Sequence, residues 1–185
     1  LYADELSVLN PEKNFSLEHC EERCFLAYKD GKIAGRIAGI VQNKYNEISR
    51  RKCIRFSRFD CIDDAEVAKA LLAAVEAFGK EKGMDTMHGP WGFNDQDREG
   101  LLTYGFDRRA TYVTNYNYEY SEKLVKDNGF TDESEWLEYD FTVPEEVDER
   151  ISRISERIKE KLGVRDLAES MSMKKMVKEY GYEAI

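Results

Sequence analysis

The segment of residues 24–42, CFLAYKDGKIAGRIAGIVQ, constrains the fold of this chain more than any other. Two runs rich in apolar residues flank the tetrapeptide KDGK. Asp30 and Gly31 at its centre form a dipeptide typical of tight hairpin turns. The segment therefore predicts two antiparallel neighbouring strands, and with them a protein built around a sheet.

The residues after the hairpin indicate a strand, a long helix and another strand. Residues 52–62 alternate as a strand does, until the pattern breaks at the tripeptide FDC. Residues 63–83 carry one apolar stripe at helical spacing and end in glycine. Asp63, with glutamate three residues later, forms a capping-box-like start for this helix. Residues 84–90 are short and partly apolar, which favours a strand.

The second half of the chain predicts further elements of both kinds. Residues 108–117 read as extended, residues 116–130 as a short helix stopped by an Asn-Gly pair, and residues 134–144 as a strand. An amphipathic helix then begins at Pro144. Its apolar stripe consists of Val147, Ile151, Ile154, Ile158 and Leu162. A weaker stripe follows at Met173, Met176, Val177 and Tyr180.

This order of elements predicts an α/β or α+β fold, a mixed central sheet flanked by helices. We expect one domain at residues 1–143 and a helical extension at residues 144–185. The extension has three possible partners: the domain itself, which we prefer, a further domain, or a second copy of the chain. Because the first residue is leucine rather than methionine, we also expect residues to precede it.

Charge and hydropathy exclude several classes of function. The formal net charge is −9, which argues against nucleic acid as a partner because phosphate binding needs clustered lysine and arginine. No run of about 18 apolar residues occurs, so no membrane partner is expected. The first residues lack the basic start of a signal peptide. We therefore expect a cytoplasmic protein that acts on a small molecule.

Two clusters allow alternative interpretations. The basic run at residues 49–58, SRRKCIRFSR, is either a solvated strand edge or a local patch for an anionic ligand. The four cysteines, Cys20, Cys24, Cys53 and Cys61, do not have the spacing of a zinc site. We expect reduced thiols that pack as small hydrophobic groups, and no metal.

The segment of residues 88–106, HGPWGFNDQDREGLLTYGF, gathers rare residue types in a glycine-rich loop. One interpretation is a capped loop held by ion pairs and buried aromatic rings. The other is one wall of a substrate site. The residues that would contact a substrate are Trp91, Phe93, Asn94, Asp95, Asp97 and Arg98.

The element order, the hairpin AYKDGKIAGRIAG and the later KDNGF resemble the GNAT (Gcn5-related N-acetyltransferase) superfamily. The closest likeness is to uncharacterised bacterial GNAT-like proteins that share a DGK..GRIA hairpin, a GP.GF.D.DREG loop and a YNY.Y helix. It covers most of residues 1–150. The resemblance implies an acyl-CoA N-acyltransferase fold and transfer of an acyl group from acetyl-CoA, or another acyl-CoA, to an amine.

The resemblance also implies where the groups of the site lie. The cofactor would cross the opening between the third strand and the long helix, its pyrophosphate held by backbone N–H groups. Cofactor-binding residues would be Phe59, Asp60, Cys61, Ile62, Asp64, Ala65 and Asn117. Tyr120 would protonate the departing thiolate, and His88 or Glu138 would accept the proton of the amine.

Three departures from the superfamily favour a second hypothesis, a non-catalytic GNAT-like domain that binds a ligand or acts as a scaffold. The turn CIDDAEV lacks the usual glycines and holds three acidic residues, which are also typical of a helix cap. Val125 stands where the superfamily often has tyrosine. The residues before Cys24 are too few for a first strand and two helices, so the N-terminal part of the fold would be incomplete.

Overall fold

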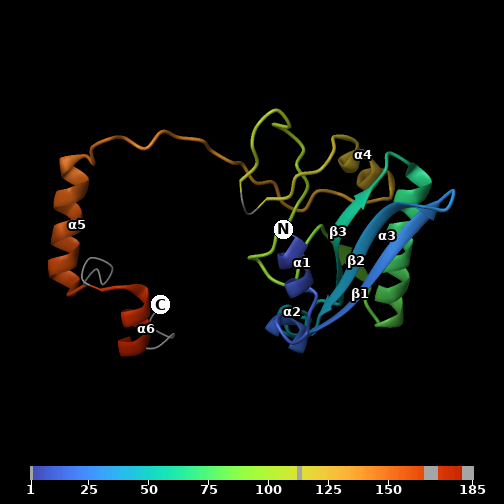
Figure 1. Ribbon diagram of the computed structural model, residues 1–185, viewed down its shortest axis with the longest axis horizontal. Helices are drawn as coiled ribbons and strands as arrows, with labels where there is room; N and C mark the ends of the chain where they lie inside the picture. The colour runs from blue at the N-terminus through green and yellow to red at the C-terminus, as the bar shows by residue number, and fades with distance from the viewer. Residues whose placement is uncertain (1, 112–113, 165–170, 181–185) are drawn as a thin grey trace. The chain divides into compact units, whose positions relative to one another are not determined.

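The computed structural model describes residues 2–111, 114–164 and 171–180, and the chain divides into two compact units, residues 1–134 and 135–185. The first unit contains a four-stranded sheet in the order β1-β2-β3-β4 (Figure 1). Its strands are β1 (Cys20–Lys29), β2 (Lys32–Gln42), β3 (Cys53–Cys61) and β4 (Thr86–His88). The first three strands are antiparallel neighbours, and β4 lies parallel to β3. The expected mixed α+β architecture is thus confirmed.

The predicted hairpin is confirmed, and it begins earlier than expected, at Cys20. Its turn places Asp30 and Gly31 at φ angles of 51° and 75°, the left-handed region that tight hairpin turns require. Asn and Asp tolerate this region better than other side chains, and glycine adopts it freely. The Asp-Gly pair therefore selects the turn and, with it, the register of the first two strands.

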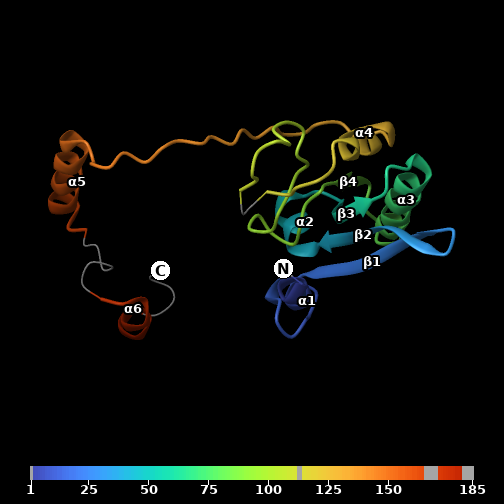
Figure 2. The same cartoon turned by 45° about the horizontal axis from the view of Figure 1, so that its top comes forward.

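Helices cover the sheet and connect its strands (Figures 1 and 2). The first unit contains α1 (Tyr2–Val8), the 3-10 helix η1 (Phe15–Glu18), α2 (Asn43–Ser49), α3 (Ala65–Glu81) and α4 (Tyr120–Asp127). The second contains α5 (Glu149–Leu162) and α6 (Met173–Tyr180). Helix α2, between β2 and β3, was not predicted. The cap of α3 is Asp64 rather than the expected Asp63, because the Asp64 carboxylate accepts the first free N–H groups.

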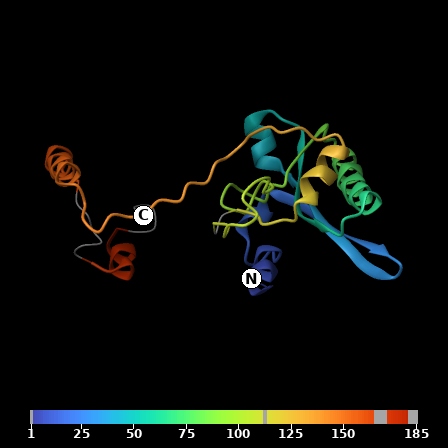
Figure 3. The same ribbon diagram turned by 90° about the horizontal axis from the view of Figure 1, so that it is seen from above.

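The core of the first unit lies between α3 and the sheet, and α4 packs beside α3 (Figure 3). Ile37, Val41, Ile54, Phe56, Val67, Leu71, Val75 and Phe78 form most of it, with Leu124 and Val125 from α4. The helix approaches the sheet at glycines. A Cβ atom on Gly79 would lie 2.7 Å from Cγ2 of Ile54, and one on Gly35 would lie 2.8 Å from Cδ1 of Leu71 in the helix. Small residues thus set the distance between the two layers.

Two predicted strands are absent from the described residues. Residues 135–143 have no regular secondary structure, and Trp136, Tyr139 and Phe141 are exposed there. In residues 108–117 the described part forms only an isolated bridge, between Thr114 and Glu99, and residues 112–113 lie outside it. Alternation of apolar and polar residues fits a strand, but a strand also needs a partner for its backbone N–H and C=O groups.

Candidate functional site

The candidate site lies where β3 and β4 separate. The two strands pair only from Cys53 to Arg55, and β3 continues to Cys61 after β4 has ended at His88. The chain leaves β4 at Gly89, where a Cβ atom would lie 2.4 Å from the Phe56 carbonyl oxygen. Only glycine allows this close approach. The strand expected at residues 84–90 is therefore confirmed over Thr86–His88.

A β-bulge lies in the part of β3 beyond this point. Arg36 pairs with Asp60 and Ala38 with Ser57, so a single β2 residue faces two residues of β3, Arg58 and Phe59. Arg58 has a φ angle of 53°, which is uncommon for a residue with a side chain. The bulge explains why the alternating pattern of the sequence breaks just after it. Bulges bend a strand and redirect its side chains, and they are frequent beside active sites.

The end of β3, the turn after it and the first residue of α3 contain most of the predicted cofactor-binding residues. Ile62 is exposed, Cys61 is buried and Asp60 forms a 3.9 Å ion pair with Arg36. The resemblance assigned the backbone N–H groups at the start of α3 to a pyrophosphate. The Asp64 carboxylate occupies two of them, accepting from Glu66 and Val67 at 3.0 and 3.2 Å.

Lys29, at the end of β1, forms an ion pair with the same Asp64 carboxylate. The hydrogen bond from Lys29, together with those from the helix backbone, lowers the pKa of Asp64. The carboxylate is therefore ionised at neutral pH. It sits where an anion at this helix end would bind.

Tyr120, the predicted acid, opens α4 and lies at the end of β3. Its hydroxyl donates to the Cys61 carbonyl oxygen at 2.8 Å. The ring stacks on Tyr118, with centroids 5.3 Å apart and planes 11° from parallel. Burial, the largest cause, and the neighbouring Cys61 and Asp60 raise the pKa of Tyr120. The phenol is therefore protonated at neutral pH and can act as a proton donor.

The predicted cofactor residue Asn117 supports the loop below this tyrosine. Its side chain exchanges two hydrogen bonds with the backbone of Leu102, at 2.7 and 3.1 Å, and donates to the Tyr118 carbonyl oxygen at 3.0 Å. All of these partners belong to the chain itself. The amide thus fixes the path of the chain into α4.

Arg55 holds the glycine-rich loop against the sheet, a role that the sequence did not predict. Its side chain is only 3% exposed. The guanidinium donates to the carbonyl oxygens of Gly92 and Phe93, at 2.9 and 3.2 Å, and lies 3.5 Å from the centroid of the Trp91 ring. In the sequence this arginine belongs to a basic run that looks solvated. The strand period places it on the face opposite Ile54, so periodicity gave no indication that it would be buried.

The predicted substrate residues of this loop divide into two groups. Phe93 is buried, and its N–H donates to the Asp97 carboxylate at 2.6 Å, so these residues shape the loop rather than face solvent. Trp91 also faces the interior, where it meets the ring of Tyr45 edge-on at 5.3 Å. The exposed side chains are Asn94, Asp95 and Arg98.

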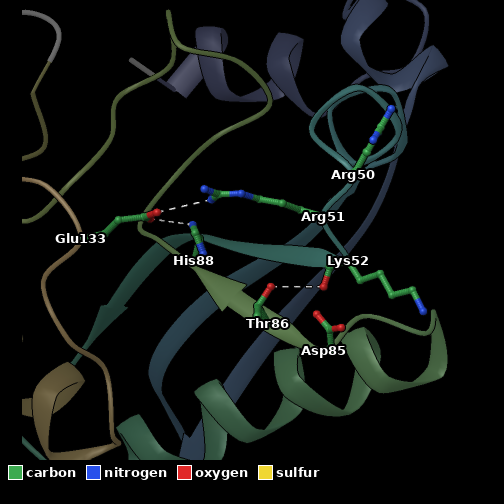
Figure 4. Close-up of a pocket in the computed structure, with 7 residues that line it drawn as sticks. All are labelled: Arg50, Arg51, Lys52, Asp85, Thr86, His88 and Glu133. Carbon is green, nitrogen blue, oxygen red and sulfur yellow. Dashed lines mark hydrogen bonds and ion pairs between the residues drawn. The ribbon is translucent and has the colours of Figure 1, made fainter.

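His88 lies in an open depression at the edge of β4 (Figure 4). The residues that line it are Arg50, Arg51, Lys52, Asp85, Thr86, His88 and Glu133. The Glu133 carboxylate lies 2.8 Å from Nδ1 of His88 and 3.3 Å from the Arg51 guanidinium. The sequence did not predict Glu133. Glu138, the other expected base, lies in the second unit and is exposed.

The cysteines are free thiols, and Cys53 and Cys61 are buried as expected of small hydrophobic groups, whereas Cys20 is half-buried and Cys24 is exposed. Burial raises the pKa of Cys61 to about 11, and it is the largest cause of the same shift, to about 11, at Cys20 and Cys24. Such thiols are neutral at physiological pH and poor nucleophiles. The described residues contain no group of histidine, cysteine and carboxylate side chains that would hold a metal ion. Nor do they include a helix long and apolar enough to cross a membrane.

Comparison with known proteins identifies two relatives. Protein YghO of Escherichia coli (strain K12) is 35% identical over 95 residues, 51% of this chain and 24% of that protein. Bacterial ceramide synthase of Caulobacter vibrioides is 27% identical over 158 residues, 83% of this chain and 41% of that protein. The chain thus spans less than half the length of either relative. No family model matches the chain. No solved structure matches it either.

Proposed function

We propose that residues 1–134 form the cofactor side of an acyl-CoA-dependent N-acyltransferase with a GNAT-like fold. The reaction would transfer an acyl group from acetyl-CoA or another acyl-CoA to an amine on a small molecule. The observation that carries the proposal is the Tyr120 hydroxyl, held 2.8 Å from the Cys61 carbonyl oxygen. It lies at the end of a bulged strand, beside the opening where the resemblance places the thioester.

The chemistry follows from these positions. The amine nitrogen attacks the thioester carbonyl carbon, a C–N bond forms, and the C–S bond breaks with the electron pair on sulfur. Tyr120 donates a proton to that thiolate, a role that suits a phenol whose pKa is raised. His88, the expected acceptor of the amine proton, pairs with Arg55, six residues before Cys61 on β3 and so about 20 Å along the strand from Tyr120. Because it is too far away to act on the same thioester, the proposal gives the amine proton to a water molecule.

The relative named a ceramide synthase supports an amine acceptor. A ceramide is an amide of a fatty acid with an amino alcohol, so the name denotes N-acylation. The match includes 83% of this chain but only 41% of that protein. The acceptor and the acyl chain length of the present protein therefore belong to the proposal and must be tested.

A second candidate, a GNAT-like domain without catalysis, is favoured by one observation. The Asp64 carboxylate accepts the N–H groups of Glu66 and Val67, which the cofactor pyrophosphate would otherwise use. An anionic cofactor must displace this carboxylate or remain unbound. The two candidates thus make opposite predictions for the binding of acyl-CoA.

The decisive experiment measures binding and turnover together. Isothermal titration calorimetry with acetyl-CoA and palmitoyl-CoA, followed by mass spectrometry of amide products, would be run on the whole chain. We expect Tyr120→Phe to lower kcat by about 10²-fold or more and to leave the affinity for acyl-CoA unchanged. Tyr118→Phe is the matched control, since it removes the hydroxyl of the stacked neighbour. Absence of binding and product in the wild type would reject the enzyme and favour the second candidate.

A variant of the turn separates the candidates further. Asp64→Ala frees two backbone N–H groups and removes a negative charge near the expected pyrophosphate, so the enzyme hypothesis expects tighter acyl-CoA binding. Asp63→Ala removes the same charge from the adjacent exposed residue but frees no N–H group. Equal affinities for the two variants would show that the start of α3 is not the cofactor site.

A further inference from the structure

Helix α5 carries an apolar stripe that the other described residues of the second unit do not cover. The side chains of Ile151, Ile154, Ile158 and Leu162 are 62%, 57%, 50% and 66% exposed. At about 100° per residue these four positions lie within an arc of about 80°. A stripe of this kind on a described helix requires a partner, because isolated apolar side chains are common at surfaces but contiguous rows are not.

The charged residues of α5 are sorted around this stripe. The three glutamates of the helix, Glu149, Glu156 and Glu160, lie opposite the stripe, within about 20° of the far side. Arg150, Arg157 and Lys161 lie about 60–100° from the centre of the stripe on one side, and Lys159 lies about 100° from it on the other. Arg153 lies about 140° from the centre, beside its ion-pair partner Glu149. The helix thus has basic flanks and a mostly acidic back, within a chain whose net charge is −9.

We propose that α5 binds the surface of an anionic membrane. The stripe would lie among the acyl chains just below the headgroups, the flanking arginines and lysines would contact lipid phosphates, and the glutamates would face water. A polar helix with one apolar face and basic residues beside it is the pattern of helices that lie in a membrane interface. Because α5 is too short and polar to cross a bilayer, the proposal concerns only its surface.

The membrane proposal is limited to α5. The segment before it exposes Trp136, Tyr139 and Phe141, but residues 135–148 hold six acidic side chains and no basic one, so an anionic surface would repel that segment. A second copy of the chain fits less well. Two paired α5 helices would bring arginine and lysine flanks against each other, and 14 residues provide only two heptads of contact.

This proposal departs from the sequence expectation of no membrane partner and does not depend on acyl transfer. Flotation with vesicles of phosphatidylcholine alone, and with about 30% phosphatidylglycerol added, tests it on the whole chain. We expect binding to the anionic vesicles that weakens with salt. Ile154→Asp should reduce the partition coefficient by about tenfold or more, and Arg150→Gln with Arg157→Gln should abolish the preference for anionic lipid.

The control is Ser152→Asp, which adds the same charge outside the stripe and should change binding by less than about threefold. Circular dichroism of each variant checks that the first unit is still folded, and Ile158→Asp repeats the test at a second position of the stripe. Light scattering gives the oligomeric state. Failure to bind anionic vesicles would overturn the proposal. So would a dimer in solution that Ile154→Asp dissociates, or equal binding of the Ile154→Asp and Ser152→Asp variants.

Discussion

Replacing Arg55 with methionine tests whether this buried cation holds the glycine-rich loop in place. The guanidinium makes two hydrogen bonds to loop carbonyl oxygens and stacks on the Trp91 ring at 3.5 Å. Hydrogen bonds from a charged donor contribute about 1.5–3 kcal/mol each, and a desolvated cation–π contact about 2 kcal/mol. Methionine has a similar length and fills the same space. Because it is neutral, the variant also avoids the free-energy cost of burying a charge.

The net loss follows from these opposing contributions. Removing one partner of a buried ion pair costs about 3–5 kcal/mol because an unpaired charge is left behind. Here the partners are neutral carbonyl oxygens and aromatic rings, so no charge is stranded. We therefore expect Arg55→Met to lower the free energy of unfolding by about 2–3 kcal/mol. The free energy of unfolding of Arg55→Lys should lie between those of the wild type and Arg55→Met, because lysine keeps the charge but lacks the planar guanidinium that donates to both carbonyl oxygens.

Urea unfolding followed by circular dichroism measures this change, and hydrogen exchange of the loop amides shows where it acts. The exchange of Phe93 N–H, which donates to Asp97, should accelerate in Arg55→Met. Arg36→Met is the control, since Arg36 is an exposed arginine on β2 whose loss should change stability by less than about 0.5 kcal/mol. If both variants lose the same free energy of unfolding, Arg55 does not anchor the loop.

Two further predictions concern the core and the thiols. Gly79→Ala should lower the free energy of unfolding, measured in urea, by about 1–3 kcal/mol, because the new Cβ meets Ile54. Alanine normally stabilises a helix relative to glycine, so a more stable variant would contradict this packing. Cys61, with a pKa raised to about 11, should react with iodoacetamide at pH 8 about a hundredfold more slowly than an ordinary thiol. Because its folded pKa exceeds the unfolded value, the unfolding free energy should fall as pH rises from about 9 to 11, and a flat profile would refute the shift.

The sheet and its main helix were predictable from local sequence. The Asp30-Gly31 turn, the alternation of β3 and the stripe of α3 each depend on residues only a few positions apart, and each prediction is confirmed. The prediction of a strand at residues 134–144 is wrong, because strand formation there depends on residues far away in the sequence. Whether an alternating segment pairs depends on a partner strand elsewhere in the chain, and periodicity does not encode that partner.

For the candidate site, the resemblance named residues but not their contacts. It gave Tyr120 the role of the acid, which stays a prediction, and the structure adds that its hydroxyl donates to the Cys61 carbonyl oxygen at the end of β3. Arg55 and Glu133 were missed, because each looks like a solvated charge in the sequence. Their partners, the loop carbonyl oxygens and His88, lie 37 or more positions away, and only the folded chain brings them together.

The two candidate functions differ at a single ion pair. Asp64 closes the anion position at the start of α3, and Lys29 neutralises it. An acyl-CoA that displaced this carboxylate would meet two backbone N–H groups and a lysine already beside them, so the turn needs no glycine to become a phosphate site. In a non-catalytic scaffold domain, Lys29 would do no more than form the ion pair with Asp64. If the turn binds the cofactor, Lys29→Met should therefore weaken acyl-CoA binding even when Asp64 is alanine, a result that loss of an ion pair alone does not explain.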